Sequence, residues 1–375
     1  MTDLRPAARA PLLGLGFVAL LLGVAGGLAR LGLAVPAVAA GIAWHGALMA
    51  SAFFGTLIAL ERAVAIARGW AYLAPAACGL GGIVLLVGYP RTAFALLVAG
   101  SAIFLAASAW IWARHKAPHT ALLAMGALAL LSANLVLLSG RPAESAVPFW
   151  IDFLVLTIGG ERLELSRLSP VPRIARGAFA GACVFLLLSA FAALLAYRPG
   201  VGASGMLLVV VAGWLVRYDI AARTVRTGGL ARYIALCLLA GYAWLALGGA
   251  LLATGSAFDN GRALWDAALH AVLLGFVFSM VFGHAPVILP AVLRVQLPYS
   301  AAFYVPLVLL HASLALRIAG DLGLGTLARE AGGAGNALAI AAFILTAGAQ
   351  ALKGRPPGLR APSRGSSAPE DRLRP

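Results

Sequence analysis

The stretch LWDAALHAVLLGFVFSMVFGHAPVIL, residues 264–289, decides the fold class of this chain. It exceeds the roughly 20 apolar residues that a helix needs to cross the hydrocarbon core of a bilayer. It also lacks the alternation of polar and apolar residues expected of a barrel strand, and backbone amides in lipid must be bonded within the chain. We therefore expect a transmembrane helix here.

The rest of the chain repeats this pattern. Its 375 residues are 62% hydrophobic and 11% charged, with a mean hydropathy of +0.95, which excludes a water-soluble globular protein. Apolar runs between charged or Pro/Gly breaks predict spans at 12–34, 37–60, 72–89, 92–113, 120–139, 147–165, 177–197, 201–220, 231–253, 264–289, 299–318 and 333–352. The sequence thus predicts an all-α polytopic membrane protein of about twelve helices, with one transmembrane domain over residues 1–352.

The net charge of +15 could suggest a nucleic-acid partner, but its placement favours the lipid bilayer. If both termini are cytoplasmic, the inner segments hold three quarters of the 28 Lys and Arg residues, as the positive-inside rule requires. The excess of Arg over Lys, with abundant Ala and Gly, is typical of a GC-rich bacterial genome. We expect a multi-pass protein of the bacterial inner (plasma) membrane that binds no nucleic acid.

The two ends of the chain carry different signals. Arg5 and Arg9 before an apolar run resemble a signal peptide, but the run exceeds the usual apolar core of about 7–15 residues, so an uncleaved first span is expected. Residues 353–375 are rich in Pro, Ser, Gly and Arg. They are expected to form a disordered, basic cytoplasmic tail.

A weak internal repeat links the second, sixth and tenth spans. Glu61-Arg62 closes the second span, Glu161-Arg162 closes the sixth a hundred residues later, and His284 lies near the inner end of the tenth. This indicates three units of four helices. The alternative is that helices leaving the membrane inward share basic ends for topological reasons alone.

His45, His270 and His311 lie in three separate predicted spans, each roughly 9–12 Å below the outer face if the predicted ends hold. An ionisable side chain within a span usually faces the bundle interior and marks function. Neutral imidazole is a common metal ligand and a common axial ligand of haem iron. We therefore expect a metal or haem site; hydrogen-bonded structural histidines or a proton path are the alternatives.

His284 follows His270 by fourteen residues, which places both on nearly one helix face but roughly 21 Å apart along the axis. They cannot share one metal ion. A second haem would need a matching pair on another helix, and the second span has Glu61 at the corresponding inner position. His284 is thus a separate candidate ligand or polar group at the inner mouth.

Two carboxylic acids are also candidates. Asp152 lies several residues inside the sixth span beside Trp150, where proton transfer or cation pairing is a credible role. Glu61 lies at an inner span end beside Arg62, where an ion pair of structural use is the default. No motif of a phosphotransferase, dehydrogenase or hydrolase is present.

Trp44-His45 in the second span, with Leu269-His270 and Phe282-Gly283-His284 in the tenth, resembles the NnrS family of membrane proteins. The resemblance implies about twelve spans, haem and copper, and a link to nitric oxide tolerance and denitrification. The family pattern has a second histidine two residues after the first in the second span. This chain has Ala47 there, which departs from that ligand set.

The chain is more distantly similar to the catalytic subunit of haem-copper oxidases and nitric oxide reductases, a threefold pseudo-symmetric ring of twelve helices. There, histidines of the second and tenth helices bind a low-spin haem, which His45 and His270 match by helix number. The copper-binding histidines of the sixth and seventh helices have no counterpart in residues 147–165 or 177–197. Oxygen reduction at a haem-copper centre is therefore not expected.

These observations predict a membrane protein that binds haem b and/or copper, with His45 and His270 as ligands and His311 as a third ligand or nearby base. By resemblance it would act in the nitric oxide response or denitrification-linked redox chemistry, with an electron-donor protein as partner. The rival predictions are a proton-coupled transporter or channel for a small solute and a non-catalytic scaffold subunit. Whether the protein is an enzyme stays open.

Overall fold

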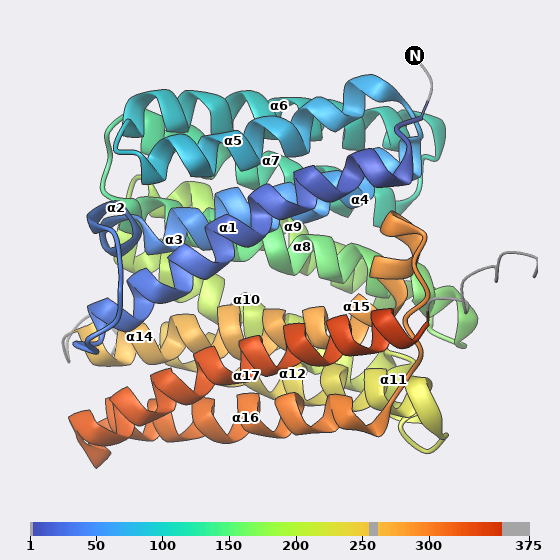
Figure 1. Ribbon diagram of the computed structural model, residues 1–375. Helices are drawn as coiled ribbons and strands as arrows, with labels where there is room; N and C mark the ends of the chain where they lie inside the picture. The colour runs from blue at the N-terminus through green and yellow to red at the C-terminus, as the bar shows by residue number, and fades with distance from the viewer. Residues whose placement is uncertain (1–2, 255–261, 355–375) are drawn as a thin grey trace, which may run out of the picture.

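The computed structural model describes residues 3–254 and 262–354 (Figure 1). Within this part of the chain every regular element is helical, and twelve helices are long and apolar enough to cross a membrane. The predicted all-α polytopic class and the number of spans are confirmed. The expected tail lies, from residue 355 onward, outside the described residues.

The bounds of the elements follow the predicted spans closely. The α-helices are α1 (Pro6–Arg30), α2 (Ala39–Ala43), α3 (His45–Ala47), α4 (Gly55–Ile66), α5 (Leu73–Leu86), α6 (Pro90–Arg114), α7 (Pro118–Leu138), α8 (Val147–Leu165), α9 (Arg173–Ala193), α10 (Tyr197–Tyr218), α11 (Ala221–Thr224), α12 (Gly229–Ala253), α14 (Arg262–His270), α15 (Val277–Leu293), α16 (Tyr304–Ala319) and α17 (Thr326–Lys353). Three segments are π-helical: η1 (Leu48–Phe54), η5 (Ala271–Phe276) and η7 (Gly320–Leu324). Four short 3₁₀ turns complete the set: η2 (Gly69–Tyr72), η3 (Ala143–Ala146), η4 (Ser166–Leu168) and η6 (Ala301–Phe303).

The first span begins earlier than predicted because its charges are satisfied inside the protein. Pro6 stands in the first turn of α1, where a missing N–H costs nothing. Arg9 is buried at 2% exposure and donates hydrogen bonds to the Val292 carbonyl, at 2.9 Å, and to the Asp3 carboxylate, at 2.7 Å. A paired guanidinium can be buried, so the helix includes residues that a hydropathy count excludes.

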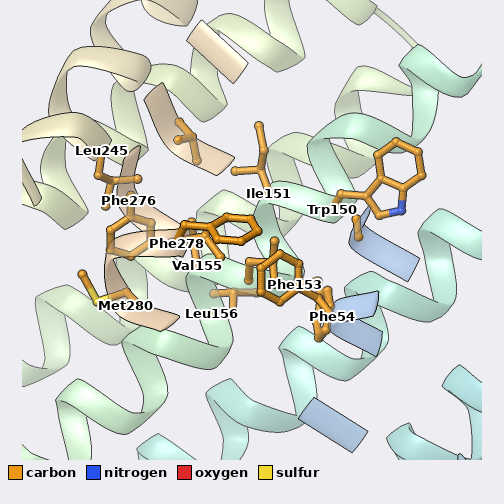
Figure 2. Close-up of a cluster of buried hydrophobic side chains, with 14 of the residues drawn as sticks. Phe54, Trp150, Ile151, Phe153, Val155, Leu156, Leu245, Phe276, Phe278 and Met280 are labelled. Carbon is orange, nitrogen blue, oxygen red and sulfur yellow. The ribbon is translucent and has the colours of Figure 1, made fainter. Parts of the chain in front are cut away.

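Every fourth span lies at the centre of the bundle. The second, sixth and tenth spans have 61%, 78% and 61% of their apolar windows buried, the highest shares of the twelve. Figure 2 shows their side chains meeting, with Phe54 from η1, Phe153 from α8 and Phe278 from α15 in one cluster. Each predicted four-helix unit would contribute one of these central helices, and the division into three units stays a prediction.

The two central spans that carry histidines are interrupted. In the second span, Trp44 has non-helical backbone angles (φ −114°, ψ 26°), α3 begins at His45, and the π-helical segment η1 follows. In the tenth, α14 ends at His270 and η5 begins at the next residue. Single π-helical turns inside α-helices are frequent at functional sites, so both histidines lie beside a backbone feature of that kind.

The two ends of the bundle carry different elements. The chain enters α1 and leaves α17 at the same end, which we call the terminal end, and α2 and the start of α14 lie at the opposite, distal end (Figure 1). Helix α1 contacts both α15 and α17, so that the first and last spans lie together.

Candidate functional site

His45 and His270 meet near the distal end of the bundle axis. Their ring centres are 6.5 Å apart, and their ring planes differ by 17°. The two residues are 225 positions apart in the sequence and come from two central spans. The structure thus pairs the two histidines that the sequence singled out as cofactor ligands.

Both rings are oriented by hydrogen bonds through the same nitrogen. His45 Nδ1 donates to the Gly23 carbonyl at 2.7 Å, and His270 Nδ1 donates to the Asp266 carbonyl at 2.9 Å. A carbonyl only accepts, so the proton of each neutral ring is on Nδ1 and the lone pair is on Nε2. This is the tautomer in which a histidine binds a metal while a backbone carbonyl fixes its ring.

A network of ion pairs supports His270. The Asp266 carboxylate lies 3.3 Å from His270 Nδ1 and receives a 2.7 Å hydrogen bond from Arg317. Arg329 lies 3.9 Å from the same carboxylate and 2.8 Å from Asp321. Because Arg317 is only 8% exposed, Asp266 is needed to balance its charge.

Two cavities adjoin at the histidine pair, and His45 and His270 line both of them. The distal cavity, about 610 Å³, is polar and is lined by Arg30, Arg317, Arg329 and Asp266 as well as both histidines. The central cavity, about 160 Å³, is apolar apart from the shared groups and reaches toward the aromatic core. A small-molecule site usually combines an apolar body with a few placed polar groups, in about 300–1,000 Å³.

His311 lies apart from this pair. Its span runs from Ala301 to Leu324, so His311 is thirteen residues from the distal end rather than the predicted seven, or about 20 Å at 1.5 Å per residue. Trp244 Nε1 donates to His311 Nδ1 at 2.9 Å, which leaves the ring proton on Nε2. No three or more His, Cys, Asp or Glu side chains in the described residues could hold a metal ion together, so the three-histidine cluster is not formed.

His284 and Glu61 line a third cavity of about 380 Å³ toward the terminal end, which we call the terminal cavity. His284 Nδ1 donates to the Met280 carbonyl at 2.7 Å, and Arg162 donates to Nε2 at 2.9 Å. Both ring nitrogens are therefore in use, which leaves no lone pair for a metal. Glu61 faces the cavity beside Glu161.

Arg162 also lies near Asp219, which follows the last residue of α10. Asp219 Oδ1 accepts a 2.7 Å hydrogen bond from the backbone N–H of Ala221. Burial raises the pKa of the Asp219 carboxyl, and the nearby Arg162 charge opposes that rise. The positive charge of Arg162 thus lies between the His284 imidazole and the Asp219 carboxyl group at the terminal end.

Asp152 is fully buried and lines none of these three cavities. Neither of its carboxyl oxygens has a hydrogen-bond partner among the described residues. Its proposed role in proton transfer or cation pairing stays a prediction.

The sequence analysis did not select Asp266, Arg317 or Gly23. Asp266 precedes His270 by four residues, a helical spacing that brings side chains together, so this signal was present. Arg317 and Gly23 come from distant spans, and nothing local in the sequence indicates that they approach the pair.

The twelve spans and the intramembrane histidine pair define the protein as a polytopic α-helical membrane protein with a polar site on its axis. The chain belongs to the family described as Domain of unknown function (DUF8744), whose family model matches residues 9–352. No curated protein and no solved structure matches it.

Proposed function

We propose that the protein binds haem b at the distal end of the bundle, with His45 and His270 as the two axial ligands. One observation carries this proposal: the near-parallel rings, 6.5 Å between centres, with both Nδ1 atoms anchored. Imidazole–metal bonds of about 2.0–2.1 Å would set the centres of two opposed ligand rings roughly 6 Å apart. The separation of the pair supports ligation of one shared metal.

The surroundings suit the two parts of a haem. The apolar lining of the central cavity, with Trp150, Leu154 and Phe278, suits the macrocycle. The guanidinium groups of Arg30 and Arg317 in the distal cavity suit the carboxylate side chains of the haem, since Arg presents a fork of N–H donors to a carboxylate.

A haem held by both His45 and His270 would supply electron transfer rather than binding of a diatomic ligand. The role we infer is therefore electron transfer in the membrane. The NnrS resemblance supports a link to nitric oxide chemistry. The placement of basic residues supports a bacterial inner membrane with the terminal end in the cytoplasm.

The proposal is tested by a reduced-minus-oxidised absorption spectrum of detergent-purified protein, with iron and copper measured on the same sample. We expect about one iron per chain and the spectrum of a haem with two histidine ligands. If the protein contains copper but no iron, the haem proposal is wrong and the histidine pair is a copper site. If it contains neither metal after expression with sufficient haem, the proposal is overturned.

Transport is a second candidate because the cavities succeed one another along the bundle axis. Phe54, Leu154, Phe278 and Ile340 line both the central and the terminal cavity and separate them. Polar groups on both sides of an apolar layer are also typical of an occluded transport path. Proton-coupled solute flux into proteoliposomes by metal-free protein would favour this candidate.

Asp266→Asn is expected to lower haem affinity about 10- to 100-fold, the range for groups that orient a metal ligand. The substitution keeps the shape of the side chain but removes the charge beside His270 Nδ1 and Arg317. Haem titration of the apoprotein measures the effect. Asp152→Asn is the matched control, because Asp152 is buried but lines none of the three cavities. Equal affinities in both variants would contradict the role given to Asp266.

A further inference from the structure

The terminal cavity has a polar end inside an otherwise apolar lining. Side chains of α1, α4, α8, α15 and α17 surround it, and its acidic groups are Glu61 from α4 and Glu161 from α8. Neither carboxyl group makes a hydrogen bond or ion pair with a described residue. Since His284 is bonded at both nitrogens, Glu61 and Glu161 are the lining groups that can still accept a hydrogen bond at this end. The charges of Arg62 and Arg162 act on these two carboxyl groups.

The cavity reaches the side of the bundle. Its lining includes Gly348, which is exposed on α17 within the span Thr326–Lys353, whereas Val295, also in the lining, lies in the loop after α15. Nothing lies within 4 Å of the position that a Cβ on Gly348 would occupy. In a bilayer this side faces lipid, so a ligand of this cavity arrives from the membrane.

One layer of side chains separates the terminal cavity from the central cavity, which His45 and His270 line. Phe54 and Phe278 belong to this layer, with ring centres 5.5 Å apart in an edge-to-face arrangement. Figure 2 shows the two rings within the cluster at the bundle centre. A ligand in the terminal cavity would thus be a close neighbour of a haem held by His45 and His270.

We propose that the terminal cavity binds a membrane hydroquinone, with its ring hydroxyls at Glu61 and Glu161 and its isoprenoid tail in the opening beside Gly348. Three features together select this class: entry from lipid, free carboxyl groups that accept protons, and a short path to a redox group. The electron-transfer part rests on the proposed function.

The reaction balances with ferric haem as oxidant. Oxidation of one hydroquinone to the quinone releases two electrons and two protons. A haem held by His45 and His270 would supply a one-electron acceptor, so complete oxidation of one hydroquinone would require two haem-loaded protein molecules. The two protons pass to the carboxyl groups of Glu61 and Glu161 and leave at the terminal end.

The experiment uses the full chain and a hydroquinone with a single isoprenoid unit as the probe. Binding is followed by equilibrium dialysis of the oxidised quinone, and transfer by the rate at which half an equivalent of hydroquinone reduces the haem. Gly348→Phe should fill the opening and lower both binding and rate at least tenfold. Gly181→Phe on α9 is the matched control, since Gly181 also has nothing within 4 Å, and should change neither.

Glu61→Gln with Glu161→Gln should slow haem reduction at least tenfold while leaving the haem spectrum intact. His270→Ala should lose haem and still bind the quinone, which separates this proposal from the previous one. Quinone binding that is absent in the wild type, or equal in the Gly348→Phe and Gly181→Phe proteins, would overturn the quinone site whatever the haem content.

Discussion

His270→Ala is expected to lower the haem bound per chain at least about tenfold, because even groups that only orient a metal ligand change affinity by about 10- to 100-fold. His45→Ala should have the same effect, since the two ring centres are 6.5 Å apart and no group of three or more potential ligands that could hold a metal is found in the described residues. The measurement is haem absorbance and iron content per chain after purification.

His311→Ala is the control for these two variants. It also removes a half-buried imidazole from a membrane span, but its Nδ1 is occupied by Trp244, and it lines neither the distal nor the central cavity. We expect its haem content to match that of the wild type. Full haem in both His45→Ala and His270→Ala, or equal loss in all three proteins, would rule out the assigned ligands.

Gly26→Ala is expected to destabilise the protein by about 1–3 kcal/mol, the usual cost of overpacking a close contact. A Cβ on Gly26 would overlap the carbonyl group of Gly41, which is backbone and cannot rotate away. Helix α2 would have to move from α1. Only Trp44 separates His45 from α2, and His45 is bonded to Gly23 on α1. The Gly26→Ala variant should therefore lose bound haem as well as stability.

Gly14→Ala offers a comparison within the same helix. Nothing lies within 4 Å of a Cβ at Gly14, and alanine is favoured over glycine in a helix interior by roughly 0.5–1 kcal/mol. This variant should unfold at the same temperature as the wild type or slightly above it. Thermal unfolding of both variants in one detergent measures the difference. A similar fall in unfolding temperature in both variants would show that overlap with the Gly41 carbonyl is not the cause.

The number of spans could be predicted from the sequence because every helix that crosses the bilayer needs about 20 mostly apolar residues. The spans end differently where charges find partners within the protein. The eleventh span was predicted to end at residue 318, but Arg329 pairs with Asp321 at 2.8 Å, so the helical span continues to Leu324. This extension puts thirteen residues, rather than the predicted seven, between His311 and that end of its span.

The histidine pair was indicated by residue type and helix number, but its geometry was not. Neither the non-helical backbone at Trp44 nor the π-helical segments can be recognised from the residue types around them. The contact between Asp266 and Arg317 depends on how α14 packs beside α16. These features arise from tertiary packing, which a single sequence does not encode in its periodicity.

The π-helical segment η5 has a consequence for how this family can vary in length. A residue added to or removed from an α-helix turns everything beyond it by about 100°. A π-helical turn holds one residue more than an α-helical turn, so a one-residue deletion within residues 271–276 that restored regular α-helix would leave both His270 and His284 close to their present orientations. The tenth span should therefore tolerate the loss of a single codon within residues 271–276 more readily than elsewhere along its length.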